Sequence, residues 1–151
     1  MADARKRTES LAVLVGTVAA TGPGLTLTLR DPASAVGPAV LLDEIQELRA
    51  AGAEATQIGG ANGKQVRLGI DPAVTGSSGA INVDGTGLSP PYTVVTIGDP
   101  PTLAAALNIP GGVIDTVARA GGTLSVEQAR QVRVEALRVP RTPQYARPAG
   151  R

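Results

Sequence analysis

The stretch LTLTLRDP, residues 25–32, decides the fold because it alternates apolar and β-branched polar residues and then stops at an Asp-Pro pair. This alternation predicts a half-buried β-strand. After Pro38 the apolar residues recur at helical spacing, and Gly52 fits the position that follows a helix C-cap. Residues 53–58 then predict a second strand. The apolar stripe of the helix consists of Leu41, Leu42, Ile45 and Leu48.

The same order of elements recurs in the second half of the chain. The stretch YTVVTIGDP, residues 92–100, predicts a strand that ends at another Asp-Pro pair. Helical stretches follow at residues 102–107 and 113–120, and residues 124–126 and 132–134 are the last strand candidates.

Two matching pairs of dipeptides mark this internal similarity. Asp31-Pro32 and Asp99-Pro100 are offset by 68 positions (99 − 31), and Ala51-Gly52 and Ala120-Gly121 by 69 (120 − 51). Two β-α-β units in similar register predict an α+β fold with a ferredoxin-like, split βαβ sheet, right-handed crossovers, extra hairpin strands and an N-terminal helix. Chance similarity is the alternative, because both dipeptides are common.

Gly and Asn residues divide the rest of the chain into short strands and turns. Residues 22–24 and the Asn62-Gly63 pair predict turns, the second of them a tight hairpin. Residues 66–70 and 80–83 predict strands that extend the sheet or form a hairpin at its edge. The Gly/Ser stretch at residues 76–79 predicts an exposed loop tip.

The two ends of the chain differ from the part between them. We expect residues 1–16 to be an N-terminal helix, the end of a linker or coiled coil, residues 17–139 to be a single α+β domain, and residues 140–151 to be a disordered Pro/Arg tail. Residues 11–20 also resemble a secretory signal, but acidic residues interrupt the basic stretch before them. This run is too short for a transmembrane helix, which needs roughly 20 apolar residues. The alternative for the tail is a tether to an anionic surface.

Composition removes several classes of chemistry. The chain has no Cys and no His, which excludes disulfides, thiol nucleophiles, structural zinc sites of the usual kind and a histidine general base. A net charge of +1 gives no general argument for nucleic-acid binding, and two Tyr are too few for base stacking.

Two polar stretches were weighed as chemical motifs. GGANGKQ, residues 59–65, lacks both the first glycine and the hydroxyl residue of a phosphate-binding loop, so a hairpin is the better interpretation. Asp43, Glu44 and Glu47 form an acidic group on the predicted helix, but no further ligands for a metal ion stand nearby in the sequence. A solvated helix face is therefore expected for these three carboxylates.

Three further candidates also have simpler explanations. Pro90-Pro91-Tyr92 is similar to part of a WW-domain ligand, yet it enters a strong strand, where prolines are tolerated at the first residue. Ser77 and Ser78 have no base nearby in the sequence, and Lys64 in a Gly-rich loop is expected to be exposed and protonated. The sequence thus assigns no catalytic, cofactor-binding or metal-binding residue, and it predicts no cofactor.

Four stretches together resemble a known family. LLDEIQELRAAGAEA at residues 41–55, TGPG at 21–24, LSPPY at 88–92 and IGDP at 97–100 are similar in order and spacing to the bacterial "domain of unknown function 881" family. The resemblance covers roughly residues 11–137. It implies a Gram-positive, membrane-anchored envelope protein, often encoded near cell-division genes, with an N-terminal transmembrane helix, a helical linker and this domain outside the membrane. The family offers no agreed catalytic residues.

The resemblance and the sparse chemistry lead to two hypotheses of function. The first is a non-enzymatic extracytoplasmic domain that acts through protein contacts, with division or wall-assembly proteins, or a second copy, as partners. Its contact surface would be an exposed strand edge or the N-terminal helix. The second is an ACT-like small-ligand sensor that uses backbone amides at Gly59-Gly60 or Gly111-Gly112. We expect no enzyme and no nucleic-acid partner, a parent protein at the cell membrane, and a soluble fragment.

Overall fold

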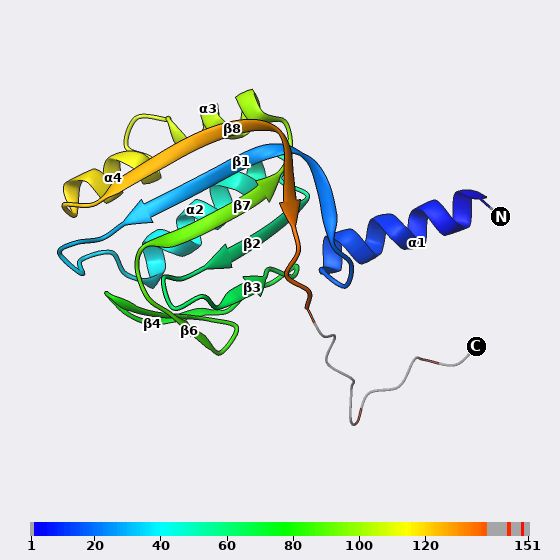
Figure 1. The fold of residues 1–151 in the computed structure, drawn as a ribbon, viewed down its shortest axis with the longest axis horizontal. Coiled ribbons are helices and arrows are strands. Elements are labelled where there is room, and N and C mark those ends of the chain that lie inside the picture. The colour runs from blue at the N-terminus through cyan, green and yellow to red at the C-terminus, as the bar shows by residue number, and fades with distance from the viewer. Residues whose placement is uncertain (1, 139–144, 146–148, 150–151) are drawn as a thin grey trace.

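The computed structural model describes residues 2–138, Tyr145 and Ala149, which form an α+β fold with two antiparallel sheets (Figure 1). The large sheet has the strand order β3-β2-β7-β1-β8, with β1 (Ala20–Arg30), β2 (Ala55–Gly59), β3 (Gln65–Arg67), β7 (Tyr92–Ile97) and β8 (Thr123–Val134). The small sheet consists of β4 (Val74–Ser77), β5 (Ala80–Val83) and β6 (Thr86–Leu88). The helices are α1 (Ala2–Val15), α2 (Pro38–Ala50), α3 (Pro100–Leu107) and α4 (Val113–Arg119). The predicted α+β class is confirmed.

The helical connections of the large sheet pass over its strands. Helix α2 connects β1 to β2, and β7 lies between these two strands. Helices α3 and α4 connect β7 to β8, and β1 lies between them. All neighbouring strands are antiparallel, so β1 and β2 run in the same direction. The first and second halves of the chain therefore interleave in one sheet.

The main core lies between the large sheet and helices α2, α3 and α4 (Figure 1). Leu27, Val94 and Ile58 stand opposite one another on three neighbouring strands, so they share the face that the helices cover. Ile81 and Val83 of the small sheet are also fully buried in this core. Because the chain has few aromatic residues, closely packed aliphatic side chains fill this core.

Local signals explain why α2 begins and ends where the sequence predicts. The Asp31 carboxylate accepts hydrogen bonds from the amides of Ala35 (2.8 Å) and Val36 (3.0 Å), which fixes the turn that follows β1. Pro38 occupies the first helical turn, where its missing N–H costs nothing. Gly52 follows the C-cap with a φ of +99°, a conformation that glycine adopts without strain.

The predicted turn at residues 22–24 is wrong, because these residues lie inside β1. The register of β1 against β8 shifts between Gly22 and Gly24, a β-bulge that keeps the strand continuous. A Cβ at Gly24 would overlap the carbonyl oxygen of Thr96, so this glycine allows β1 and β7 to approach closely. The two separate strands predicted at residues 124–126 and 132–134 are in fact one strand, β8.

The middle of the chain departs from its prediction in two places. The predicted loop tip at residues 76–79 is partly strand, because Gly76 and Ser77 belong to β4. The strand predicted at residues 66–70 is reduced to β3, and Ile70 lies outside it with 71% of its side chain exposed. The Asn62-Gly63 hairpin is confirmed, since these residues join β2 to β3.

Helix α1 is found where an N-terminal helix was expected, and it projects away from the sheet (Figure 1). No helix among the described residues is both long enough and apolar enough to span a membrane. The division into residues 1–16, 17–139 and 140–151 stays a prediction. The expected disorder of the tail falls outside the described residues, except at Tyr145 and Ala149.

Candidate functional site

The polar side chains that are candidates for chemistry do not lie together at one site. Ser77, Ser78 and Lys64 are all exposed, and Lys64 closes the β2–β3 hairpin by accepting the amide of Gly60 at 3.1 Å through its main-chain oxygen. In the described part of the chain, no three acidic, His or Cys residues are grouped so that they could hold a metal ion. Tyr92 is fully buried at the start of β7, in agreement with the strand-entry interpretation of the two prolines.

The prediction of a solvated acidic face on α2 is wrong for Glu44. Its side chain is fully buried, because it occupies the position three residues after Leu41 on the core-facing stripe. Burial, with a smaller contribution from the nearby Glu47 charge, raises the pKa of Glu44 from 4.5 to about 8. Neither carboxyl oxygen has a hydrogen-bond partner. Glu44 is therefore a protonated, neutral acid at pH 7, closed off from any substrate.

The other two carboxylates of this group have different surroundings. Asp43 is exposed, as expected, whereas Glu47 is half-buried beside the first turn of α4. Burial raises the pKa of Glu47, the N–H of Val113 lowers it by hydrogen bonding, and the Asp43 charge raises it. Glu47 alone of the three thus joins α2 to α4, and the three carboxylates do not share one open site.

A polar network lies around Arg67 of β3, where the segments before β1 and after β8 meet. This side chain is only 2% exposed. Its Nη1 donates to the carbonyl oxygens of Val18 (2.7 Å) and Ala136 (3.1 Å), and its Nη2 donates to that of Val13 (2.9 Å). We call these four groups the Arg67 clamp. One planar guanidinium therefore connects α1, the segment before β1 and the segment after β8.

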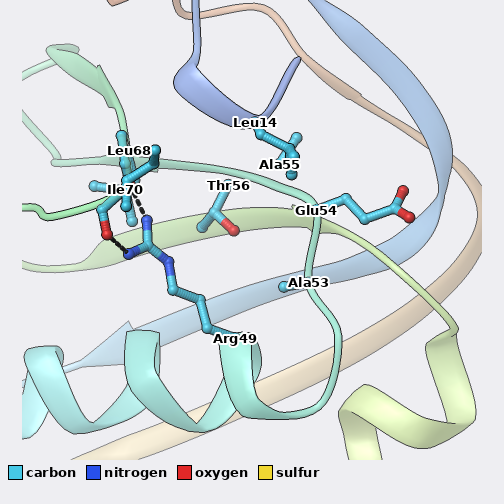
Figure 2. A pocket seen from close by; sticks show the side chains of 9 residues that line it. Leu14, Arg49, Ala53, Glu54, Ala55, Thr56, Leu68 and Ile70 are labelled. Atoms are coloured by element: carbon cyan, nitrogen blue, oxygen red, sulfur yellow. Dashed lines mark hydrogen bonds between the residues drawn. The ribbon is translucent and has the colours of Figure 1, made fainter. Parts of the chain in front are cut away.

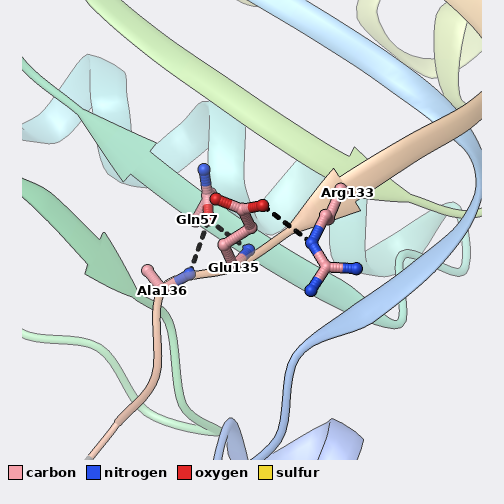
Figure 3. Close-up of polar contacts among 4 residues, drawn as sticks. All are labelled: Gln57, Arg133, Glu135 and Ala136. Carbon is pink, nitrogen blue, oxygen red and sulfur yellow. Dashed lines mark hydrogen bonds and ion pairs between the residues drawn. The ribbon is translucent and has the colours of Figure 1, made fainter.

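A second buried polar side chain, Gln57 of β2, supports the Arg67 clamp. Its Oε1 accepts the amides of Glu135 and Ala136, both at 2.9 Å (Figure 3). Arg133 and Glu135 form an ion pair at 2.7 Å above it, but both side chains are more than half exposed and the pair adds little stability. The segment after β8 is thus fixed across the sheet by its main chain.

A hollow of about 290 Å³ lies beside the Arg67 clamp, between α1, the end of α2 and β2 (Figure 2). Arg49, in the last turn of α2, crosses it and donates to the carbonyl oxygens of Gly69 and Ile70. Its rim carries the exposed apolar side chains of Leu14 and Ile70. Two nitrogens of the Arg49 guanidinium are therefore already engaged by main-chain oxygens of this hollow.

A second hollow, of about 380 Å³, lies at the opposite edge of the sheet, and we call it the β8 hollow. It is lined by Pro23, Pro100, Pro101, Gln128, Ala129 and Arg130. Three proline rings give it a stiff apolar wall, because proline has almost no rotamer freedom to lose.

Comparison with known proteins then places the chain. The profile of a family described as bacterial protein of unknown function (DUF881) matches residues 7–147. The chain belongs to the DUF881 family. UPF0749 protein Rv1825 of Mycobacterium tuberculosis is 54% identical over 145 residues, which cover 96% of this chain and 49% of that protein. UPF0749 protein YlxW of Bacillus subtilis is 29% identical over 138 residues, 85% of this chain and 58% of that protein.

A solved structure agrees with the fold of this DUF881 chain. An uncharacterized conserved protein from Mycobacterium tuberculosis superimposes with a TM-score of 0.88 and 55% sequence identity, covering 95% of this chain and 99% of that chain. This DUF881 chain spans about half the length of the curated mycobacterial relatives that are 54% identical to it. The predicted family membership is confirmed.

Sequence reasoning missed the main polar features of this DUF881 domain. Neither Arg67 nor Gln57 belongs to a recognisable sequence motif. Alternation predicts that Arg67 lies on one face of a short strand. It does not predict that the segments before β1 and after β8 both cross that face. The one available signal was a charged residue between apolar neighbours, Val66 and Leu68. That pattern is equally typical of a strand with one solvated face.

Proposed function

We propose that this chain is a non-enzymatic, extracytoplasmic domain of a bacterial envelope protein that works through contacts with other proteins. The observation that carries the proposal is the Arg67 clamp, which holds the last turn of α1 against the domain while the rest of the helix projects (Figure 1). A domain fixed in this way to a projecting helix is suited to be presented at the end of a linker. The proposed location in the envelope and the expected division or wall-assembly partners come from the family resemblance.

The exposure of α1 supports its role as a linker end. Leu11 is 61% exposed and Leu14 is 49% exposed, although both are large and apolar. With Ala4 and Arg7 they follow the 3-4-3 spacing of one helical seam. An isolated helix of this length is marginally stable in water. These features favour a continuous helix in the parent protein that pairs with another helix, and a second copy of the chain is the simplest such partner.

We further infer that strands β2, β7, β1 and β8 form a ferredoxin-like sheet. The order β2-β7-β1-β8 and the two helical connections, each passing over one strand, support this interpretation. The relation to ACT-like sensors is weaker, because the candidate amides are occupied. Gly111 donates to the Asp115 carboxylate (2.7 Å), and Gly60 donates to Lys64.

Topology can be tested by cysteine labelling, since the chain has no Cys. Ser77 is exposed on β4, and Ser77→Cys places a single thiol of this domain on its surface. In the full-length parent protein, a membrane-impermeant maleimide should label this thiol in intact cells. The unsubstituted parent protein reports labelling at any cysteine elsewhere. Labelling that requires cell lysis would overturn the extracytoplasmic placement.

The mode of action has its own test. Affinity capture with the full-length protein, after cross-linking in cells, should recover specific proteins that a parent lacking residues 17–139 does not recover. A thermal-shift screen with amino acids, nucleotides and wall precursors should leave the melting temperature unchanged. Stabilisation by one of these compounds, without a captured protein, would favour the sensor over the interaction domain.

A further inference from the structure

We propose that the first half of β8, Thr123 to Gln128, accepts an extended segment of a partner protein as an added strand, and that this segment places a large apolar side chain in the β8 hollow. A carboxylate next to that side chain would bind Arg130. The inference deepens the proposed function and rests on it, because it assigns the surface through which the domain makes a protein contact.

The first support is that β8 is an open edge of the large sheet. In the part of the chain that the structure describes, β8 pairs with β1 and with no other strand. The pairing is regular from Arg30↔Thr123 to Leu25↔Gln128. Alternate residues of a strand direct their N–H and C=O groups away from the neighbour, so a partner strand would find unpaired donors and acceptors along this half of β8.

The second support is where the features that protect a strand edge are placed. Bulges and charged residues protect sheet edges against pairing with another chain. In β8 the register shift and two arginines, Arg130 and Arg133, all come after Gln128. Before Gln128 only Glu127 is charged. One half of β8 is therefore protected against pairing, and the other half is accessible.

The third support is the position and stiffness of the β8 hollow. Gln128, at the end of the accessible half, is part of its wall, so a strand paired along β8 would reach the hollow at that end. Two hydrogen bonds fix the backbone around the hollow. The amide of Gly98 donates to the Pro23 oxygen at 2.9 Å, and the Asp99 side chain caps α3 by accepting from the Thr102 amide at 3.2 Å. A preformed apolar hollow lowers the entropic cost of binding a side chain.

The fourth support is charge. Arg130 lines the β8 hollow, is exposed and forms no ion pair among the described residues. A cation beside a proline-walled hollow matches an apolar side chain followed by a carboxylate, either an acidic residue or a free C-terminus. Main-chain pairing would supply affinity, and the hollow with Arg130 would supply specificity.

Random dodecamer peptides displayed on phage provide the probe, selected on the whole chain. Selected peptides should share a large apolar residue next to a carboxylate, and their amidated and free-acid forms distinguish the two sources of that carboxylate. Arg130→Glu should weaken their binding at least about tenfold, which corresponds to ~1.4 kcal/mol. Gln128→Trp, which fills the β8 hollow, should act in the same direction. The matched control is Arg119→Glu, the same charge change at an exposed position on α4.

In cells, a photo-reactive benzoylphenylalanine at Ser125 of the parent protein should cross-link to a partner. The same residue at Thr75, exposed on the edge strand β4, should not. No selected peptide, or binding that Arg130→Glu and Gln128→Trp leave unchanged, would overturn the β8 assignment. Cross-linking at Ser125 to a second copy of the chain would also overturn it. In each case the labelling and capture experiments still decide the proposed function separately.

Discussion

The two edges of the five-stranded sheet are used in opposite ways. On the β3 side of the sheet, Arg67 and Gln57 bind main-chain groups of both terminal segments, although Nε of the buried Arg67 has no hydrogen-bond partner. At the β8 edge, pairing stops at β1 and a stiff apolar hollow lies beside the strand. Within the described residues, buried side chains bind the two terminal segments on the β3 side, whereas β8 pairs with β1 alone.

The largest expected effect comes from breaking the β3 side at Arg67. Arg67→Met removes the hydrogen bonds that Arg67 donates to three main-chain carbonyls, and we expect the free energy of unfolding to fall by about 3 kcal/mol or more. Arg67→Lys should recover only part of the lost stability, because a lysine ammonium lacks the planar set of N–H donors of a guanidinium. Urea unfolding measures the loss, and faster hydrogen exchange in α1 should accompany it. An unchanged urea midpoint would show that the Arg67 clamp is not needed.

A smaller loss is expected at the neighbouring glutamine. Gln57→Leu removes the acceptor of two amides and should cost about 2 kcal/mol, again measured by urea unfolding. Gln65→Leu is the matched control, since Gln65 is an exposed glutamine on β3. The control should change stability by less than about 0.5 kcal/mol. Equal effects of the two substitutions would contradict the special role of Gln57.

The buried Glu44, in the core between the two edges, is expected to make the free energy of unfolding depend on pH. The folded protein keeps the Glu44 proton up to about pH 8, whereas the unfolded chain loses it near its ordinary pKa of 4.5. Stability contributed by Glu44 is therefore fully present at low pH and lost as pH rises through this window. Glu44→Gln should make the urea midpoint fall less between pH 5 and pH 8 than in the wild type. An equal fall in both proteins would show that Glu44 ionises normally.

The smallest effect is expected at the exposed ion pair of Arg133 and Glu135, which lies beside Gln57 (Figure 3). Arg133→Ala breaks an ion pair whose side chains are 59% and 66% exposed, and it should change the free energy of unfolding by less than about 0.5 kcal/mol. Thermal unfolding at low and high salt measures it, and the small effect should shrink further in salt. A loss comparable to that of Gln57→Leu would contradict the view that the buried Gln57 contacts, and not the exposed ion pair, hold this segment.

Local sequence patterns predicted the helices and strands, but they could not predict contacts between residues that are far apart in the sequence. The Leu41, Ile45 and Leu48 spacing and the alternation at residues 25–29 predicted α2 and the core of β1, because each signal lies within a few neighbouring residues. The same helical spacing missed Glu44, since polarity normally indicates the solvent side.

The polar network and the turn errors have a related cause. Gln57 meets Ala136 across 79 positions of sequence, so no local pattern could show that contact. The turn predicted at residues 22–24 was wrong because a Gly-Pro-Gly stretch is typical of turns. Here Gly24 instead allows a close approach of β1 and β7. Tertiary packing determined both outcomes.

The shared attachment point of the two terminal segments has a mechanical consequence. Val13 and Ala136 accept hydrogen bonds from the same guanidinium, and the Arg138 amide donates to the Gly16 oxygen at 2.7 Å, so the segments that enter and leave the domain are joined over a short path. Tension that pulls these segments apart would load those bonds first. The strands of the sheet, which lie outside this short path, would carry force only after these bonds had broken.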